Sequence, residues 1–195
     1  MFYSWAVEER ARRIVESAVE LAERGGFEAV RLRDVASHAG VALGTLYRRF
    51  HSKEDLLIAA LEQAIGDQRE RLIQRPVRGD TRRDRVSHFF QGTTRALCRR
   101  PNLARAMIRA VATGDPELTQ KMAAFHAQVG ELVTMALRGA AAPGEGGPVS
   151  EEERAVSHTL QMVWFAALVG WTGGVTSQAG IVEQTRVAVE LMLDD

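Results

Sequence analysis

Side chains that can bind phosphate and base edges gather in one short segment near the N-terminus. Between Arg31 and Lys53 the chain carries five basic residues and only one acidic residue, Asp34, although the whole chain of 195 residues has no formal net charge. A basic patch on a neutral protein favours docking at a defined site on a polyanion over general coating of it.

The residue types in this segment suit different contacts. A threonine hydroxyl can bond a phosphate or a base edge, and its methyl group can contact thymine, whereas arginine, lysine and tyrosine can bind phosphate. Gly44 lets the backbone approach a ligand closely. Lys53 begins a helix, where free backbone N–H groups also favour a phosphate. The candidate contacts with DNA are therefore Arg33, Gly44, Thr45, Tyr47, Arg48 and Lys53. The alternative for Arg33 and Arg48 is an ordinary solvated face of the protein.

The spacing of turn and apolar residues places these side chains on a helix-turn-helix. The pattern predicts a helix over residues 32–39, a turn at Gly40 and a short helix over residues 43–50. Leu46 and Phe50, four residues apart, form the buried side of the second helix. The opposite side of that helix is then free to enter the major groove of DNA.

The rest of the chain predicts helices as well. A helix over residues 8–24 ends at the Gly25-Gly26 pair, and capping patterns at Ser52, Asp115 and Ser150 begin later helices. No strand pattern competes with this reading. We therefore expect an all-α protein of about nine helices. A three-helix, helix-turn-helix domain would occupy residues 1–55 and a larger helical bundle residues 56–195.

Composition limits the setting in which the chain works. Cys98 is the only cysteine, so an intramolecular disulfide is excluded and a reducing compartment is favoured. The N-terminal residues lack the apolar stretch of a secretory signal, and no segment is long and apolar enough to span a membrane, so we expect a cytoplasmic protein. The terminal aromatic residues Phe2, Tyr3 and Trp5 can be disordered, pack on the first helix or lie along DNA.

The segment GVALGTLYRRFHSKEDL, residues 40–56, resembles the signature of TetR-type transcriptional regulators. The matching residues are Gly40, Val41, Gly44, Leu46, Tyr47, Phe50, Ser52, Lys53 and Leu56, with Gly26, Phe27, Val35 and Ala36 upstream. This resemblance covers about the first quarter of the chain. It implies an all-helical C-terminal domain that dimerises through its last two helices and binds a small ligand.

A second resemblance extends further along the chain, to actinobacterial repressors of steroid (cholesterol) catabolism. It rests on scattered residues: the Ser4-Trp5-Ala6 start, the run from Val41 to Arg48, the segment from Arg100 to Ala110, and the closing Val163-Trp164, Trp171 and Ala188 to Met192. Regulators of that group are released from DNA by steroid acyl-CoA intermediates, which implies an effector of the same class here.

Methionine and aromatic side chains in the C-terminal part suit the lining of an adaptable apolar pocket, although such a stripe is more often plain core. The candidate ligand-binding residues are Phe89, Met107, Met122, Phe125, His126, Val129, Trp164 and Trp171. Arg109, in an apolar run, is either solvated or paired with an anionic ligand group. The histidines lack the spacing of metal ligands, so neither a metal nor a cofactor is expected.

Two segments near the C-terminus, residues 162–171 and 187–193, are apolar on nearly every side. A helix of this kind is buried on every side, and a second copy of the same chain is the natural cover. The candidate homodimer interface consists of Phe165, Leu168, Trp171, Val187 and Leu191.

Together these features predict a DNA-binding regulator with no membrane partner. It would repress transcription as a homodimer on a near-palindromic operator and be released by a hydrophobic small molecule, a steroid or an acyl-CoA catabolite. The alternative is a regulator without an effector, whose C-terminal core would be filled and lack a cavity. An enzyme is not expected, because the chain has no Glu-x-x-His pair and no nucleophile in a recognisable motif.

Overall fold

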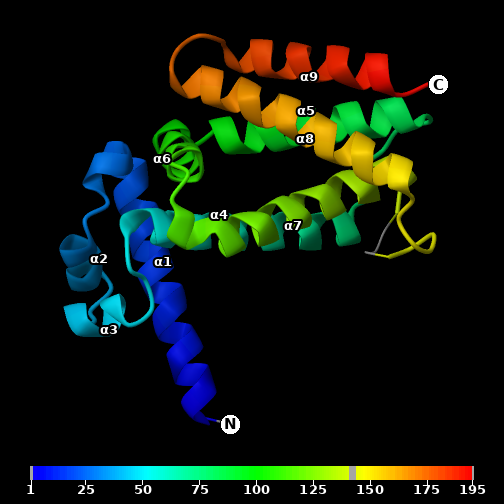
Figure 1. Cartoon of the computed structure of the whole chain (residues 1–195). Helices are drawn as coiled ribbons and strands as arrows, with labels where there is room; N and C mark the ends of the chain where they lie inside the picture. Colours follow the sequence, from blue (N-terminus) through cyan, green and yellow to red (C-terminus); the bar gives the residue numbers. More distant parts are fainter. Residues whose placement is uncertain (1, 141–143, 195) are drawn as a thin grey trace. The chain divides into compact units, whose positions relative to one another are not determined.

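A computed structural model of the chain describes residues 2–140 and 144–194, with the side chains of residues 2–7 left out. Within these ranges the chain is all-helical, as predicted, with nine α-helices, one short 3-10 helix and no strand (Figure 1). The helices are α1 (Phe2–Ala29), α2 (Leu32–His38), α3 (Leu43–Tyr47), α4 (Lys53–Gln74), α5 (Arg82–Cys98), α6 (Pro101–Ala112), η1 (Pro116–Leu118), α7 (Thr119–Arg138), α8 (Glu151–Thr172) and α9 (Gln178–Met192).

Local sequence explains where several helices begin. The side chain of Ser150 accepts a bond from the backbone N–H of Glu153, whose carboxylate accepts in return from the backbone of Ser150, so α8 begins with a complete capping box. Asp115 caps η1, which leads directly into α7. At the start of α4 the hydroxyl of Ser52 accepts from the N–H of Asp55. These three predicted helix starts are confirmed.

The first helix is longer than predicted and contains a kink. It begins at Phe2, and the side chains of Phe2, Tyr3 and Trp5 lie outside the described residues. Gly25 and Gly26 depart from helical geometry, with Gly26 at a φ of 68°, a conformation that glycine adopts without strain. The glycine pair therefore ends the straight part of the helix, as expected, and a last turn follows at a new angle.

The helices form two compact units that do not follow a single cut in the sequence. The first unit contains residues up to Gln63 together with Arg100–Met122, and the second contains Ala64–Arg99 and the residues from Ala123 onwards. The predicted boundary between residues 55 and 56 therefore falls inside the first unit. The beginning of α4, all of α6 and the beginning of α7 belong with the N-terminal helices.

The first unit is built on one apolar core. Ile14, Val35 and Leu46 are almost fully buried there, at 1%, 0% and 0% exposure, and Phe27 and Phe50 are buried in the same core. Helix α6 adds a stripe at helical spacing to the same core: Leu103, Ala106, Met107 and Ala110. The three-helix domain therefore does not bury its core alone, because α6 covers it.

The second unit is a bundle in which α9 packs against both α8 and α5 (Figure 1). Phe90, Leu160 and Ile181 are at most 1% exposed in its centre. The indole Nε1 of Trp164 donates to the hydroxyl of Thr94 at 2.9 Å, so the polar end of this large side chain is satisfied inside the core. None of the described helices is long and apolar enough to cross a membrane.

Candidate DNA-binding surface and ligand cavity

The turn between α2 and α3 has the tight geometry of a helix-turn-helix. Gly40 has a φ of 64°, and the backbone N–H of Val41 donates to the carbonyl of Ala36 at 3.0 Å, which closes the turn. Leu46 then points into the core at 0% exposure, as predicted. Helix α3 ends at Tyr47, three residues before the predicted end, and a turn carries the chain to the buried Phe50.

The six candidate DNA contacts all lie at least partly on the surface of the first unit. Gly44 and Tyr47 are exposed on α3, and Arg48 is exposed directly after it. Thr45 on α3 is partly exposed and accepts a bond from the Arg48 guanidinium at 3.2 Å. Arg33 is exposed on α2, and Lys53 begins α4. Thr45 and Arg48 therefore lie side by side, while the role of all six residues in binding DNA stays a prediction.

A buried carboxylate fixes the turn that follows α3. Asp55 is 1% exposed, and its Oδ2 accepts from the backbone N–H of His51 at 3.0 Å. Its other oxygen is bound by the ammonium group of Lys121, which comes from the beginning of α7. The Asp55–Lys121 pair carried no local sequence signal, because its members are 66 residues apart.

The second unit contains an open cavity of about 840 Å³ between α7, α8 and the loop that joins them. Its walls combine small apolar side chains with groups that can hold a polar ligand: His126, Glu131, Thr134, Arg154, Ser157, His158 and Gln161. The imidazole Nδ1 of His126 lies 2.8 Å from the amide nitrogen of Gln161. Burial, with the nearby His158, lowers the pKa of His126, which favours its neutral form.

Arg138 holds the loop beside the cavity in place. Its guanidinium binds both carboxylate oxygens of Glu153 at 2.7 Å and donates to the carbonyls of Glu145, Gly147 and Pro148 at 2.9–3.0 Å. This bidentate pair, with the backbone of Ser150, lowers the pKa of Glu153 to about 2. The cavity wall is therefore fixed by charge-assisted bonds.

Several of the exposed apolar side chains of the second unit lie on α8 and α9. Leu191 is 82% exposed and Val187, one turn earlier, is 40% exposed, while Val169 on α8 is 37% exposed. Phe165 is partly exposed on α8. We call these four residues the α8–α9 patch.

Comparison with known proteins identifies the family. The model of bacterial regulatory proteins of the tetR family matches residues 14–60, and that of the tetracyclin repressor-like C-terminal domain matches residues 79–192. The chain is 35% identical over 192 residues to the HTH-type transcriptional repressor KstR of Rhodococcus jostii (strain RHA1), covering 97% of this chain and 85% of the relative. The chain belongs to the TetR family.

Other relatives agree with this assignment. This TetR-family chain is 32% identical to KstR of Mycobacterium tuberculosis (strain ATCC 25618 / H37Rv) over 98% of its own length and 84% of that protein. A solved TetR transcriptional regulator from Rhodococcus sp. RHA1 superposes with a TM-score of 0.80 at 29% identity, covering 95% of each chain. Thermus thermophilus FadR, solved with lauroyl-CoA, shares the fold at a TM-score of 0.73 and 20% identity, over 93% of this chain and 92% of that one. The relatives are transcriptional repressors and not enzymes, and this regulator is a DNA-binding protein of the same kind.

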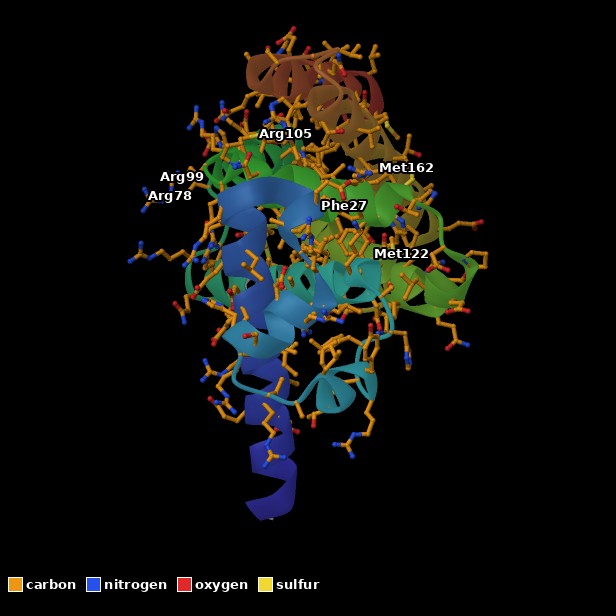
Figure 2. The ribbon with its side chains drawn as sticks, turned by 90° about the vertical axis from the view of Figure 1, so that its left-hand side faces the viewer. Phe27, Arg78, Arg99, Arg105, Met122 and Met162 are labelled. Atoms are coloured by element: carbon orange, nitrogen blue, oxygen red, sulfur yellow. The ribbon has the colours of Figure 1, made fainter. Side chains whose placement is uncertain are left out.

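The TetR-family structure brings together only some of the predicted ligand and dimer residues. Of the eight candidate ligand residues, only His126 lines the cavity. Met107 is buried in the core of the first unit, and Met122 lies at the end of that unit (Figure 2). The five that remain, Phe89, Phe125, Val129, Trp164 and Trp171, are buried in the second unit. The described residues contain no group of three or more side chains placed to hold a metal ion.

Burial also divides the predicted dimer residues. Leu168 and Trp171 are 2% and 9% exposed within the single chain, because the bundle itself covers them. Val187, Leu191 and Phe165 belong to the α8–α9 patch and remain available to a partner. Their role in dimerisation stays a prediction.

Replacing Gly44 by alanine is expected to weaken DNA binding about fivefold, or about 1 kcal/mol, while the chain becomes no less stable. A Cβ at Gly44 meets no atom within 4 Å, and alanine is the better helix former by about 1 kcal/mol. We therefore expect the added methyl group to interfere only with the close approach of DNA to α3. Fluorescence anisotropy with labelled duplex and urea unfolding would measure the two effects.

Gly66→Ala is the matched control for this substitution. Gly66 is also exposed in a helix, on α4, and a Cβ there meets no atom within 4 Å. We expect the same gain in stability and unchanged DNA affinity. Equal DNA binding by Gly44→Ala and the original chain would show that α3 does not approach DNA at this point.

Acid should remove the contribution of the Glu153 carboxylate to stability. Because its folded-state pKa of about 2 lies below the ordinary value of 4.5, ionised Glu153 stabilises the fold above pH 4.5, and this contribution is lost as the pH falls towards 2. Glu153→Gln should therefore be less stable than the original chain at pH 7 and nearly equal to it near pH 2. Urea unfolding across this range would measure the difference, and a difference independent of pH would contradict the assignment.

Proposed function

We propose that this chain is a repressor that binds a near-palindromic operator as a homodimer and is released from it by a hydrophobic small molecule. We assign the effector to the steroid or acyl-CoA catabolites. The observation that carries this proposal is the similarity to the KstR repressors, because it extends over both the DNA-binding helices and the C-terminal bundle. The residues that would select an effector are included in that match.

The cavity in the second unit supports the effector part of the proposal. A regulator without an effector would have no use for an open space of about 840 Å³, a size suited to a small organic ligand. Neutral His126 and Gln161 can bond a keto, hydroxyl or thioester oxygen, and Arg154 at the wall can face an anionic group. The cavity therefore suits a molecule with an apolar body and polar or anionic ends.

The α8–α9 patch supports the homodimer. Symmetric association through one surface brings two recognition helices to the same side of a duplex, where half-sites lie about 34–36 Å or a multiple of the helical turn apart. An effector that favours another spacing of these helices lowers operator affinity, typically by about 5- to 150-fold.

Measurement of DNA release by candidate effectors tests this proposal. Labelled duplexes that tile the region upstream of the chain's own gene would first be screened by anisotropy for binding. Steroid-CoA thioesters, the matching free steroids and fatty acyl-CoAs of several lengths would then be titrated into the complex. We expect at least one CoA thioester or free steroid to lower operator affinity at least fivefold and to raise the melting temperature of the free protein.

A cavity variant and its control make this test specific. Ala127 is an exposed cavity-lining residue on α7, so Ala127→Trp should block the effector response and leave operator binding intact. Ala124→Trp, at an exposed position of the same helix that does not line the cavity, should retain the response. Operator affinity unaffected by every compound, with no thermal shift, would leave the regulator without an effector as the better description.

A further inference from the structure

Phe27 follows the glycine kink of α1 and is labelled in Figure 2. Two cations lie against its aromatic ring. The ammonium group of Lys53 lies 3.9 Å from the centre of its ring, and the guanidinium carbon of Arg109 lies 4.3 Å from the same centre. Both distances are those of cation–π contacts. These contacts therefore join the beginning of α4 and the outer face of α6 to the end of α1.

Glu28 lies between the two cations and binds both of them. Its Oε2 is 3.4 Å from the Lys53 ammonium nitrogen, and its Oε1 is 3.0 Å from an Arg109 guanidinium nitrogen. The bond with Lys53, and then the charges of Lys53 and Arg109, lower the pKa of Glu28, which is ionised at neutral pH. One carboxylate thus holds two cations, one through each oxygen.

Lys53 is also the phosphate contact predicted at the start of α4. It cannot offer all its hydrogen-bonding capacity and charge to DNA while it is bound to Glu28, and an ionised carboxylate at the same place repels a phosphate group. Glu28 is 70% exposed in its side chain, so it stands at the surface where such a phosphate would arrive. The same ammonium group therefore has two competing anionic partners.

We propose that Glu28 competes with the DNA backbone for Lys53, and that Arg109 limits this competition by holding the other oxygen of Glu28. Arg109 is then a positioning residue for DNA binding: it acts through Glu28 and does not contact phosphate itself. The inference rests on the DNA-binding part of the proposed function and is independent of any effector. It gives a role to an arginine that stands in an otherwise apolar sequence.

The position of Arg109 on α6 explains how it is held there. Helix α6 is anchored in the core of the first unit through Leu103, Ala106 and Met107. The amide of Asn102, in the first turn of α6, donates to the backbone carbonyl of Glu23 at 3.0 Å. Arg109 therefore projects from a helix fixed against α1, and its reach to Glu28 depends on that packing.

Substitution of the two partners, singly and together, tests the proposal. The probe is a fluorescein-labelled duplex of arbitrary sequence at low salt, because phosphate contacts do not depend on base sequence. We expect Glu28→Gln to raise affinity about threefold and Arg109→Gln to lower it about threefold, the range of exposed ion pairs. In the Glu28→Gln background, Arg109→Gln should have little effect, since the carboxylate through which it acts is gone.

A third substitution separates competition for Lys53 from a general change of charge. When Lys53→Ala is present, Glu28→Gln should no longer raise affinity by the same factor, and the dependence on salt should become shallower. Glu23→Gln and Arg100→Gln are the matched controls, because this pair also joins α1 to α6 and involves the same charge changes without contacting Lys53. Each control should change affinity by less than half as much.

The outcomes distinguish this inference from the proposed function. Unchanged or lower affinity in Glu28→Gln would overturn the competition. An undiminished effect of Arg109→Gln in the Glu28→Gln background would show that Arg109 contacts DNA directly and would overturn its positioning role. Failure of the original chain to bind any duplex would instead overturn the proposed function, and the inference with it.

Discussion

Replacement of Leu191 by arginine is expected to convert the regulator from a dimer to a folded monomer and to reduce operator affinity by about 100-fold or more. Leu191 is 82% exposed in the single chain, so the fold itself loses little when it is replaced. A charge within the α8–α9 patch would be buried without a partner in the dimer. Loss of the second half-site contact then removes most of the binding energy, because the two recognition helices no longer bind as one particle.

Sedimentation velocity and anisotropy with the operator duplex would measure the two parts of this prediction. Ile73→Arg is the control, because Ile73 is also an exposed apolar residue, at 42%, on a different helix, α4. It should remain dimeric and bind DNA normally. Trp171 is unsuitable for the same test, because at 9% exposure its replacement would disturb the core. A Leu191→Arg protein that remains a full dimer would place the interface elsewhere.

Replacement of Lys121 by methionine is expected to lower the free energy of unfolding by about 3 kcal/mol. It leaves the Asp55 carboxylate, 1% exposed, without its cation. Glu62 lies near this ion pair. Its pKa is raised chiefly by burial; the charge of Lys121 opposes the rise and the charge of Asp55 adds to it. Loss of Lys121 therefore leaves two carboxylates without the positive charge that they share.

Urea unfolding with two comparison variants would test this assignment. Lys121→Arg keeps the charge and should recover most of the loss. Arg69→Met breaks an ion pair with Glu131 whose side chains are 46% and 37% exposed, so it should cost less than about 1 kcal/mol. Similar losses of unfolding free energy in Lys121→Met and Arg69→Met would mean that the burial of Asp55 does not make its ion pair more stabilising than an exposed one.

Local chemistry made much of the architecture predictable. Ser150 and Asp115 mark helix starts through bonds to the backbone two or three residues later, and such bonds depend on neighbouring residues alone. Gly40 reveals the turn because its positive φ suits glycine. The burial of Leu46 on α3 and of Phe50 just after it follows from their spacing of four residues in the sequence. The candidate DNA contacts near α3 are then expected to be exposed, because they lie on the side away from Leu46.

Tertiary partners were less predictable, because an apolar stripe shows that a face is buried and not what covers it. Met107 was predicted to line a ligand pocket, yet its side chain completes the core of the DNA-binding unit. Trp171 and Leu168 were predicted to meet a second copy, yet the chain itself covers them. A pocket in the C-terminal part was predicted, with His126 among its lining residues, but most of the lining was not. His158, Arg154 and Ser157 line the cavity from α8, and the position of α8 beside α7 has no signature in the local sequence.

The inclusion of α6 in the first unit has a consequence for engineering. A hybrid repressor made by joining residues 1–55 to the ligand-binding part of another protein would lack Leu103, Ala106 and Met107 of α6. The core around Ile14 and Leu46 would then be partly exposed to solvent. A successful transplant has to carry two separate stretches of chain, up to Gln63 and from Arg100 to Met122. Exchange of DNA specificity between such regulators therefore requires both stretches of chain to be transferred together, and a single fusion point is not sufficient.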